Sequence, residues 1–297
     1  MLPFNCANIE NIPFKRKILH NFGSIPQDRS MEKTSFKKTA IVVGGSSGIG
    51  YETCLHLSAL GWNVVNISRT PCQNPKVTNI CADVTHTEEF RSAIITAAQG
   101  DGVSALIYSA GFSMAAPIEY AKEEDFRYLF EVNYFGALTA LQAVIPFMKQ
   151  RGGKIVLVSS LGGDLPVIFD SFYSSSKAAL EMLCRSAYGE LKPYNISVTG
   201  ILPGGTATNF TFKRKVYSDE ETKSYSKSVN KAVAALANME QSGMPPSQVA
   251  DIIYNILISD KPPVIKICGI KNTMFRLVSR VMPEKLTLKM NDRMYNQ

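Results

Sequence analysis

The feature that most constrains the fold is a regular alternation of short apolar runs with segments of helical period, which begins at Lys38. Runs of four to six residues are predicted to be buried strands, and they occupy 39–43, 63–68, 77–81, 105–108, 154–159, 196–201 and 264–267. Helices are predicted at 50–60, 87–98, 122–150, 171–191 and 247–258. Because parallel strands need helical crossovers between them, the sequence predicts an α/β fold with a doubly wound parallel sheet covered on both faces.

The alternating pattern ends near Cys268 and indicates one domain over 38–268 with an extension at each end. Residues 1–37 show no sustained period and contain several prolines, so we expect a loose N-terminal extension. Residues 269–297 mix apolar and basic residues and are predicted to form a basic amphipathic tail. No apolar run reaches the ~18 residues of a membrane-spanning helix, and no secretory signal is predicted.

The net charge of +7 is concentrated at the two ends of the chain. Residues 1–38 carry a net charge of +4 and residues 260–297 one of +5, whereas residues 39–259 carry −2. A domain body that is not basic argues against nucleic acid as a partner. The basic ends are interpreted as solvated tails. The alternative is a weak contact of the C-terminal tail with a membrane surface or an acidic partner.

Cysteine and histidine usage is typical of a reduced, cytoplasmic protein. The six cysteines include no Cys-x-x-Cys pair. Cys81 and Cys184 fall in strand and helix patterns and are predicted to be buried. The three histidines lie far apart in the sequence, so no metal site is predicted.

A glycine-rich turn joins the first predicted strand to the first predicted helix, with the sequence Val43-Gly44-Gly45-Ser46-Ser47-Gly48-Ile49-Gly50. Glycines let the backbone approach a pyrophosphate closely, and a helix N-terminus offers free N–H groups and partial positive charge to that anion. The residues predicted to bind the phosphates of a dinucleotide are Gly44, Ser46, Ser47, Gly48 and Ile49.

The end of the second predicted strand is where such folds select the adenosine ribose. An acid there would accept hydrogen bonds from the ribose hydroxyls of NAD, but this chain has Ser68 followed by Arg69. A guanidinium favours a 2′-phosphate, so NADP is predicted as the cofactor. Asp83 and Val84 follow the third strand and are predicted to contact the adenine. Capping of residues 85–87 by Asp83 is an alternative that does not exclude this contact.

Tyr173 and Lys177 lie four residues apart in a predicted helix and therefore share one face. A phenol with a pKa near ~10 is a weak acid–base catalyst at neutral pH, and a neighbouring ammonium lowers that pKa. Ser160 follows a predicted strand, at the sheet edge where open α/β folds bind ligands. These three side chains are predicted to polarise a carbonyl group and to transfer a proton.

Together these motifs resemble the short-chain dehydrogenase/reductase family, over about residues 38–268. The family pattern Gly-x-x-x-Gly-x-Gly matches Gly44, Gly48 and Gly50, and its catalytic residues match Ser160, Tyr173 and Lys177. The other matching or adjoining positions are Asp83, Ala110, Gly111, Asn133, Pro203, Gly204, Thr206 and Thr208. The family often has Asn-Asn-Ala-Gly after the fourth strand, where this chain has Tyr108-Ser109-Ala110-Gly111.

The resemblance implies a Rossmann-type, NADP(H)-dependent carbonyl reductase or alcohol dehydrogenase, similar to hydroxysteroid dehydrogenases. It implies that Tyr173 donates the proton and that Ser160 binds the substrate oxygen. It further implies that Lys177 lowers the tyrosine pKa and holds the nicotinamide ribose, and that Asn133 supports a water molecule. Ala110, Gly111, Pro203–Gly204, Thr206 and Thr208 would line the cofactor. A homodimer or homotetramer is implied as well.

Residues 206–246 match the family's substrate loop, which in a chain like this one can act as a lid. The aromatic residues of the loop are Phe210, Phe212, Tyr217 and Tyr225. They favour a bulky apolar substrate of steroid, retinoid or acyl type, or they hold the loop down. The basic run 213–215 is predicted to be solvated, and the alternative is that it attracts an anionic group on a substrate. The alternative functions are a catalytically silent NADP sensor and a membrane-surface scaffold on the same fold.

Overall fold

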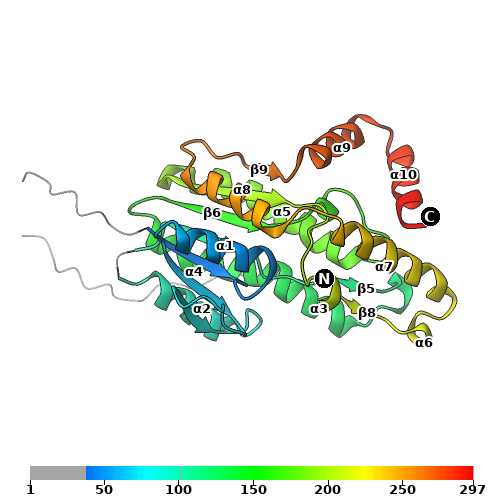
Figure 1. The fold of residues 1–297 in the computed structure, drawn as a ribbon, viewed down its shortest axis with the longest axis horizontal. Coiled ribbons are helices and arrows are strands. Elements are labelled where there is room, and N and C mark those ends of the chain that lie inside the picture. The colour runs from blue at the N-terminus through cyan, green and yellow to red at the C-terminus, as the bar shows by residue number, and fades with distance from the viewer. Residues whose placement is uncertain (1–37, 101, 297) are drawn as a thin grey trace, which may run out of the picture. The chain divides into compact units, whose positions relative to one another are not determined.

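The computed structural model describes residues 38–100 and 102–296, so the predicted extension 1–37 lies outside the described residues. Seven parallel strands form one sheet in the order β3-β2-β1-β4-β6-β7-β9 (Figure 1). The strands are β1 Thr39–Val43, β2 Asn63–Ser68, β3 Val77–Cys81, β4 Ala105–Tyr108, β6 Gly153–Val158, β7 Ile196–Leu202 and β9 Ile265–Ile267. The predicted doubly wound parallel sheet is confirmed.

Alternate residues of each strand face opposite layers of helices. In β1, Ala40 and Val42 pack in the same core as α1 (Gly48–Ala59) and α8 (Pro246–Ile258). Ile41 and Val43 pack in a second core, with α2 (Thr87–Ala98), α4 (Gly136–Met148) and α5 (Ser171–Leu191). Burial on both faces is why β1 is apolar from Ala40 to Val43.

The strand order changes direction at β1, which pairs with β2 on one side and with β4 on the other. The crossovers from these strands therefore leave the sheet in opposite directions. At such a point an α/β sheet opens a crevice at the carboxyl ends of its strands, where ligands bind. Val43 ends β1 there and lies beside Ile67 and Tyr108.

The long helix predicted within 122–150 is confirmed, but it contains a π-helical turn. The helix consists of α3 (Glu123–Phe130), the π-helical turn at Glu131–Phe135 and α4, with right-handed helical backbone at both junctions. Tyr108, fully buried at the end of β4, donates its hydroxyl to the Val132 carbonyl at 2.5 Å. A Cβ on Gly136 would lie 2.4 Å from that hydroxyl, so only glycine fits beside it. Tyr108 thus occupies the place that the family often gives to asparagine.

The substrate loop and the C-terminal tail contain further elements. They are β8 (Lys215–Val216, paired with β5, Met114–Ala115), α6 (Asp219–Thr222), α7 (Ser226–Gln241), α9 (Ile270–Val281) and α10 (Glu284–Asn296). None of the helices in the described part of the chain is long and apolar enough to cross a membrane. Cys184 is buried, but Cys81 is exposed because β3 is the edge strand of the sheet, so that prediction is wrong.

Candidate active site

The glycine-rich turn after β1 is built for close backbone approach. Gly44 has φ +83° and Gly48 φ +57°, in the left-handed region that favours glycine. A Cβ on Gly44 would lie 2.7 Å from the Ala110 backbone nitrogen, and one on Gly50 would lie 2.3 Å from the Gly44 carbonyl oxygen. This narrow cradle ends at the N-terminus of α1, whose free N–H groups fit a pyrophosphate.

Polar side chains of β2 and β3 fix the position of this turn through hydrogen bonds. The backbone N–H of Gly45 donates to Asn66 Oδ1 at 2.8 Å, and Asn66 Nδ2 donates to Asn79 Oδ1 at 2.8 Å. Asn66 is fully buried, so its amide must find partners within the protein. Asn66 was not among the residues predicted from the sequence, although an asparagine within an apolar strand is a signal that could have indicated it.

Arg69 lies at the predicted adenosine end of the turn. Its guanidinium is 70% exposed, 3.4 Å from the Tyr128 hydroxyl and 3.8 Å from the Asp83 carboxylate. Asp83 Oδ1 accepts hydrogen bonds from the backbone N–H and the hydroxyl of Thr85. Burial acts to raise the pKa of Asp83, but the Thr85 hydrogen bonds and the Arg69 charge hold that pKa below its usual range. Asp83 thus caps the turn at Thr85, and Arg69 stays accessible.

The three predicted catalytic residues meet where β6 and α5 converge. Ser160 follows β6 and caps the turn at Leu161–Gly163 by accepting from the Gly162 N–H at 3.0 Å. Lys177 Nζ donates to the Val158 carbonyl at 2.9 Å and lies 5.6 Å from the centre of the Tyr173 ring. A Cβ on Gly162 would lie within 3.5 Å of both Ser160 and Tyr173, so these two side chains flank the same glycine.

The electrostatics of the pair differ from the sequence-based expectation. Burial raises the pKa of Tyr173 above its usual value, and the hydrogen bond of the Ser160 side chain offsets only part of this rise. Burial also lowers the pKa of Lys177 to about 8. The net pKa of Tyr173 is therefore raised and not lowered, because desolvation of the phenolate is the largest effect on it.

Asn133 lies in the π-helical turn and is fully buried. Its Nδ2 donates to the Phe112 carbonyl and to the Ser176 hydroxyl, each at 3.0 Å, and its Oδ1 accepts from the Phe112 N–H at 3.0 Å. A Cβ on Gly111 would approach both Asn133 Oδ1 and Lys177 Nζ, at 3.1 Å and 3.3 Å. Asn133 thus ties the catalytic helix to the backbone beyond β4.

A cavity of about 720 Å³ brings the predicted residues together. Its lining includes every predicted cofactor, substrate and catalytic residue except Asn133, which lies behind the wall. These lining residues are Gly44, Ser46, Ser47, Gly48, Ile49, Arg69, Asp83, Val84, Ala110, Gly111, Ser160, Tyr173, Lys177, Pro203, Gly204, Thr206 and Thr208. No group of three His, Cys, Asp or Glu side chains within 38–100 and 102–296 is arranged to hold a metal ion.

Beyond Tyr173 the cavity is bounded by residues from five separate segments. Its apolar lining there consists of Leu165, Val167, Phe210, Leu236, Met239, Phe275 and Tyr295. The Phe210 ring lies 5.9 Å from the Tyr173 ring. Phe212 is exposed, whereas Tyr217 is buried and holds the loop in place. Tyr217 therefore fits the interpretation that the aromatic residues hold the loop down, and Phe210 lines the cavity.

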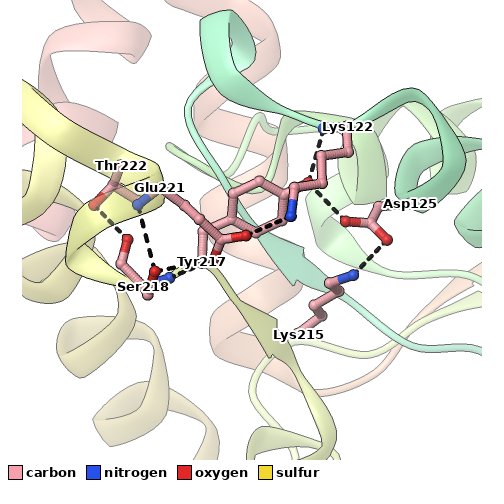
Figure 2. A network of polar contacts seen from close by, with 7 residues as sticks. All are labelled: Lys122, Asp125, Lys215, Tyr217, Ser218, Glu221 and Thr222. Atoms are coloured by element: carbon pink, nitrogen blue, oxygen red, sulfur yellow. Dashed lines mark hydrogen bonds and ion pairs between the residues drawn. The ribbon is translucent and has the colours of Figure 1, made fainter.

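The substrate loop is fastened to α3 by the polar network in Figure 2. The Tyr217 hydroxyl donates to Asp125 and accepts from the Lys122 backbone N–H, both at 2.7 Å. Lys215 pairs with Asp125, and Lys122 Nζ pairs with Glu221 at 2.6 Å. These contacts fix residues 215–222 against the start of α3. The cavity is lined by other residues of the loop.

Residues 38–216 match the short chain dehydrogenase family. This chain belongs to that family. The dehydrogenase is 32% identical over 228 residues to 3-ketodihydrosphingosine reductase of Bacteroides thetaiotaomicron, which covers 75% of this chain and 84% of the relative. It is 33% identical over 190 residues to the NADPH-dependent 1-acyldihydroxyacetone phosphate reductase of Saccharomyces cerevisiae, covering 60% and 64%. A crystal structure of a Streptomyces avermitilis short-chain dehydrogenase matches with a TM-score of 0.74 at 27% identity, covering 86% of this chain and 96% of that one.

As a family member, the protein is an oxidoreductase that acts on CH–OH groups of small molecules. Its structure also corrects the interpretation of the basic run 213–215 as solvated at Arg214, whereas Lys213 and Lys215 are exposed as expected. Arg214 is buried: its Nη2 lies 2.5 Å from Glu240, and its Nε donates to the Ser113 hydroxyl at 2.7 Å. Lys213 Nζ donates to the Ser47 hydroxyl in the glycine-rich turn at 3.2 Å. The run itself was visible, but its partners lie far away in the sequence.

Proposed function

We propose that this dehydrogenase is an NADP(H)-dependent carbonyl reductase for a bulky apolar ketone or aldehyde of steroid, retinoid or acyl type. The observation that carries the proposal is the single cavity that joins Arg69, Tyr173 and an apolar chamber. Two relatives support it, since one is named as a reductase of 3-ketodihydrosphingosine and the other as an NADPH-dependent reductase of 1-acyldihydroxyacetone phosphate.

The residues at the phosphate end fit an NADP molecule better than NAD. The glycine-rich cradle and the α1 N-terminus would hold the pyrophosphate. The accessible guanidinium of Arg69 would bind a 2′-phosphate, and no acid stands at Ser68 to repel it. Lys213 beside Ser47 adds a second positive charge on the same rim. Asp83 and Val84 would flank the adenine.

At the catalytic end, the protonated phenol of Tyr173 is the proton donor. Burial raises its pKa, so the phenol keeps its proton at neutral pH, as reduction requires. When bound, NADPH would supply the hydride that the carbonyl carbon accepts. Tyr173 then gives its proton to the carbonyl oxygen, which becomes the hydroxyl of the alcohol, while the Ser160 hydroxyl holds that oxygen in place. Lys177 would bind the nicotinamide ribose, with Asn133 fixing its surroundings.

The decisive experiment measures NADPH oxidation against a panel of steroid, retinoid, acyl and small aromatic ketones. Tyr173→Phe removes the proton donor and should lower kcat by about 100-fold or more. Tyr194→Phe, which changes an exposed tyrosine outside the cavity, should leave turnover unchanged. Equal turnover by wild type and Tyr173→Phe would refute the proposed chemistry. NADPH binding without turnover on any ketone would favour the NADP-sensing alternative.

Cofactor preference is tested by comparing NADPH with NADH. Arg69→Ala removes a charge-assisted contact worth about 1.5–3 kcal/mol, so KM for NADPH should rise about 10-fold to 100-fold while KM for NADH changes little. Arg91→Ala, an arginine outside the cavity, is the matched control. A wild-type preference for NADH would contradict the role given to Arg69.

We further propose a cytoplasmic homodimer or homotetramer. Support comes from exposed apolar side chains on two helices that cover the sheet, Phe135 at the start of α4 and Met182 on α5. Light scattering of the full chain gives the mass directly, and Met182→Glu should lower it if α5 forms the interface. A monomeric wild-type protein would contradict this assembly.

A further inference from the structure

Helix α9 presents two faces of different character. Asn272 and Phe275 line the cavity. Arg276 is buried and pairs with Asp164, which follows the turn at Leu161–Gly163. The opposite face is apolar and exposed. Its residues are Ile270 (82% exposed), Met274 (63%), Leu277 (66%), Val278 (45%) and Val281 (79%). Their spacing places them in one stripe along the helix.

Exposed basic side chains lie on the same helix and on the next one. On α9 they are Lys271 and Arg280, which also lies 3.6 Å from Asp164, and on α10 they are Lys285, Lys289 and Arg293. Residues 269–297 contain six basic and two acidic residues, a net charge of +4. An apolar stripe accompanied by exposed basic side chains is typical of helices that lie in the headgroup region of an anionic bilayer.

Charge also argues against a second copy of this chain as the occupant. A two-fold contact through α9 would bring the same positively charged surface of each copy together, and like charges at an interface are unfavourable. An anionic lipid surface has the complementary charge and accepts the apolar side chains between its headgroups.

We propose that the exposed face of α9 docks on an anionic lipid surface, with the helix as the wall between that surface and the substrate cavity. The Arg276 contacts keep the inner face of α9 on the catalytic domain, so docking requires no unfolding of the cavity wall. A ketone dissolved in the lipid would then enter the cavity beside Phe275. This route of substrate delivery rests on the proposed reductase function.

Docking is tested with the full-length protein and vesicles of phosphatidylcholine alone or mixed with phosphatidylglycerol. Wild type should sediment with the anionic vesicles, less so as salt rises. Leu277→Ser/Val281→Ser removes two exposed apolar residues and should weaken this binding at least 10-fold with the thermal midpoint unchanged. Ile118→Ser, at an equally exposed apolar residue outside α9, is the matched control and should bind as wild type does.

Turnover separates docking from chemistry. The double variant should reduce a water-soluble ketone at the wild-type rate but a vesicle-borne ketone several-fold more slowly. Wild type that ignores anionic vesicles, or an equal loss of binding in Ile118→Ser, would overturn the proposal. So would a drop in molecular mass in the double variant, because it would assign the face to a second copy. Vesicle binding without any ketone turnover would support docking and refute the reductase.

Discussion

The buried hydroxyl of Tyr108 offers the sharpest test of how this fold places Asn133. Tyr108→Phe keeps the ring in the core but removes the 2.5 Å hydrogen bond to the Val132 carbonyl. A buried hydrogen bond contributes about 0.5–1.5 kcal/mol net, and a carbonyl left without a donor costs about 1–3 kcal/mol. At about 2–4 °C per kcal/mol for a domain of this size, the thermal midpoint should fall by roughly 2–10 °C.

Gly136 provides the matching half of a double-mutant cycle. In Gly136→Ala the new Cβ would lie 2.4 Å from the Tyr108 hydroxyl and 3.1 Å from Val84 Cβ, and such overpacking costs about 1–3 kcal/mol. Removing the hydroxyl relieves the shorter contact. The double variant Tyr108→Phe/Gly136→Ala should therefore lose less unfolding free energy than the two single variants lose in total, by about 0.5–2 kcal/mol.

The assay is thermal and urea unfolding followed by circular dichroism, with kcat measured alongside. A loosened π-helical turn should lower kcat in Tyr108→Phe while leaving KM for NADPH unchanged, since the Arg69 end of the cavity is untouched. Strict additivity of the two substitutions would refute the contact between Tyr108 and Gly136. An unchanged midpoint in Tyr108→Phe would refute the role of its hydroxyl.

Three other outcomes are expected. Burial raises the pKa of Glu181 to about 7, so the stability that comes from its protonated form is lost as the pH rises from about 4.5 to 7. Glu181→Gln should therefore be more stable than wild type by about 1–3 kcal/mol above pH ~7 and equally stable near pH 4.5. Thermal melts at both pH values check this, with Glu190→Gln as the control. Gly44→Ala should weaken NADPH binding at least ~10-fold by fluorescence titration, because its Cβ would collide with Ala110, whereas Gly189→Ala, with open space around it, should not. Tyr217→Phe should raise the ketone KM several-fold and speed hydrogen exchange over 206–225, since the loop loses its bonds to Asp125 and Lys122; an unchanged exchange rate would contradict that fastening.

Local patterns account for the elements predicted at their observed bounds. The strands 39–43, 63–68, 77–81 and 105–108 and the helix 171–191 are delimited by their own apolar period and by the turns beside them. The glycine-rich turn and the spacing of Tyr173 and Lys177 are likewise properties of a few consecutive residues. For the same reason these residues could be placed in one site before any contact was known.

Other features depended on residues far apart in the sequence. The π-helical turn that interrupts 122–150 receives a hydroxyl from Tyr108, and Arg214 is buried because Glu240 and Asp170 surround it. The raised pKa of Tyr173 comes from its burial, and α9 becomes a cavity wall through Arg276. The sequence by itself determined the order of elements and the chemistry of the site, since backbone period and side-chain type are local. Only the tertiary structure decided the charge states, the position of the π-helical turn and the wall of the cavity, because these depend on desolvation and on contacts that folding creates.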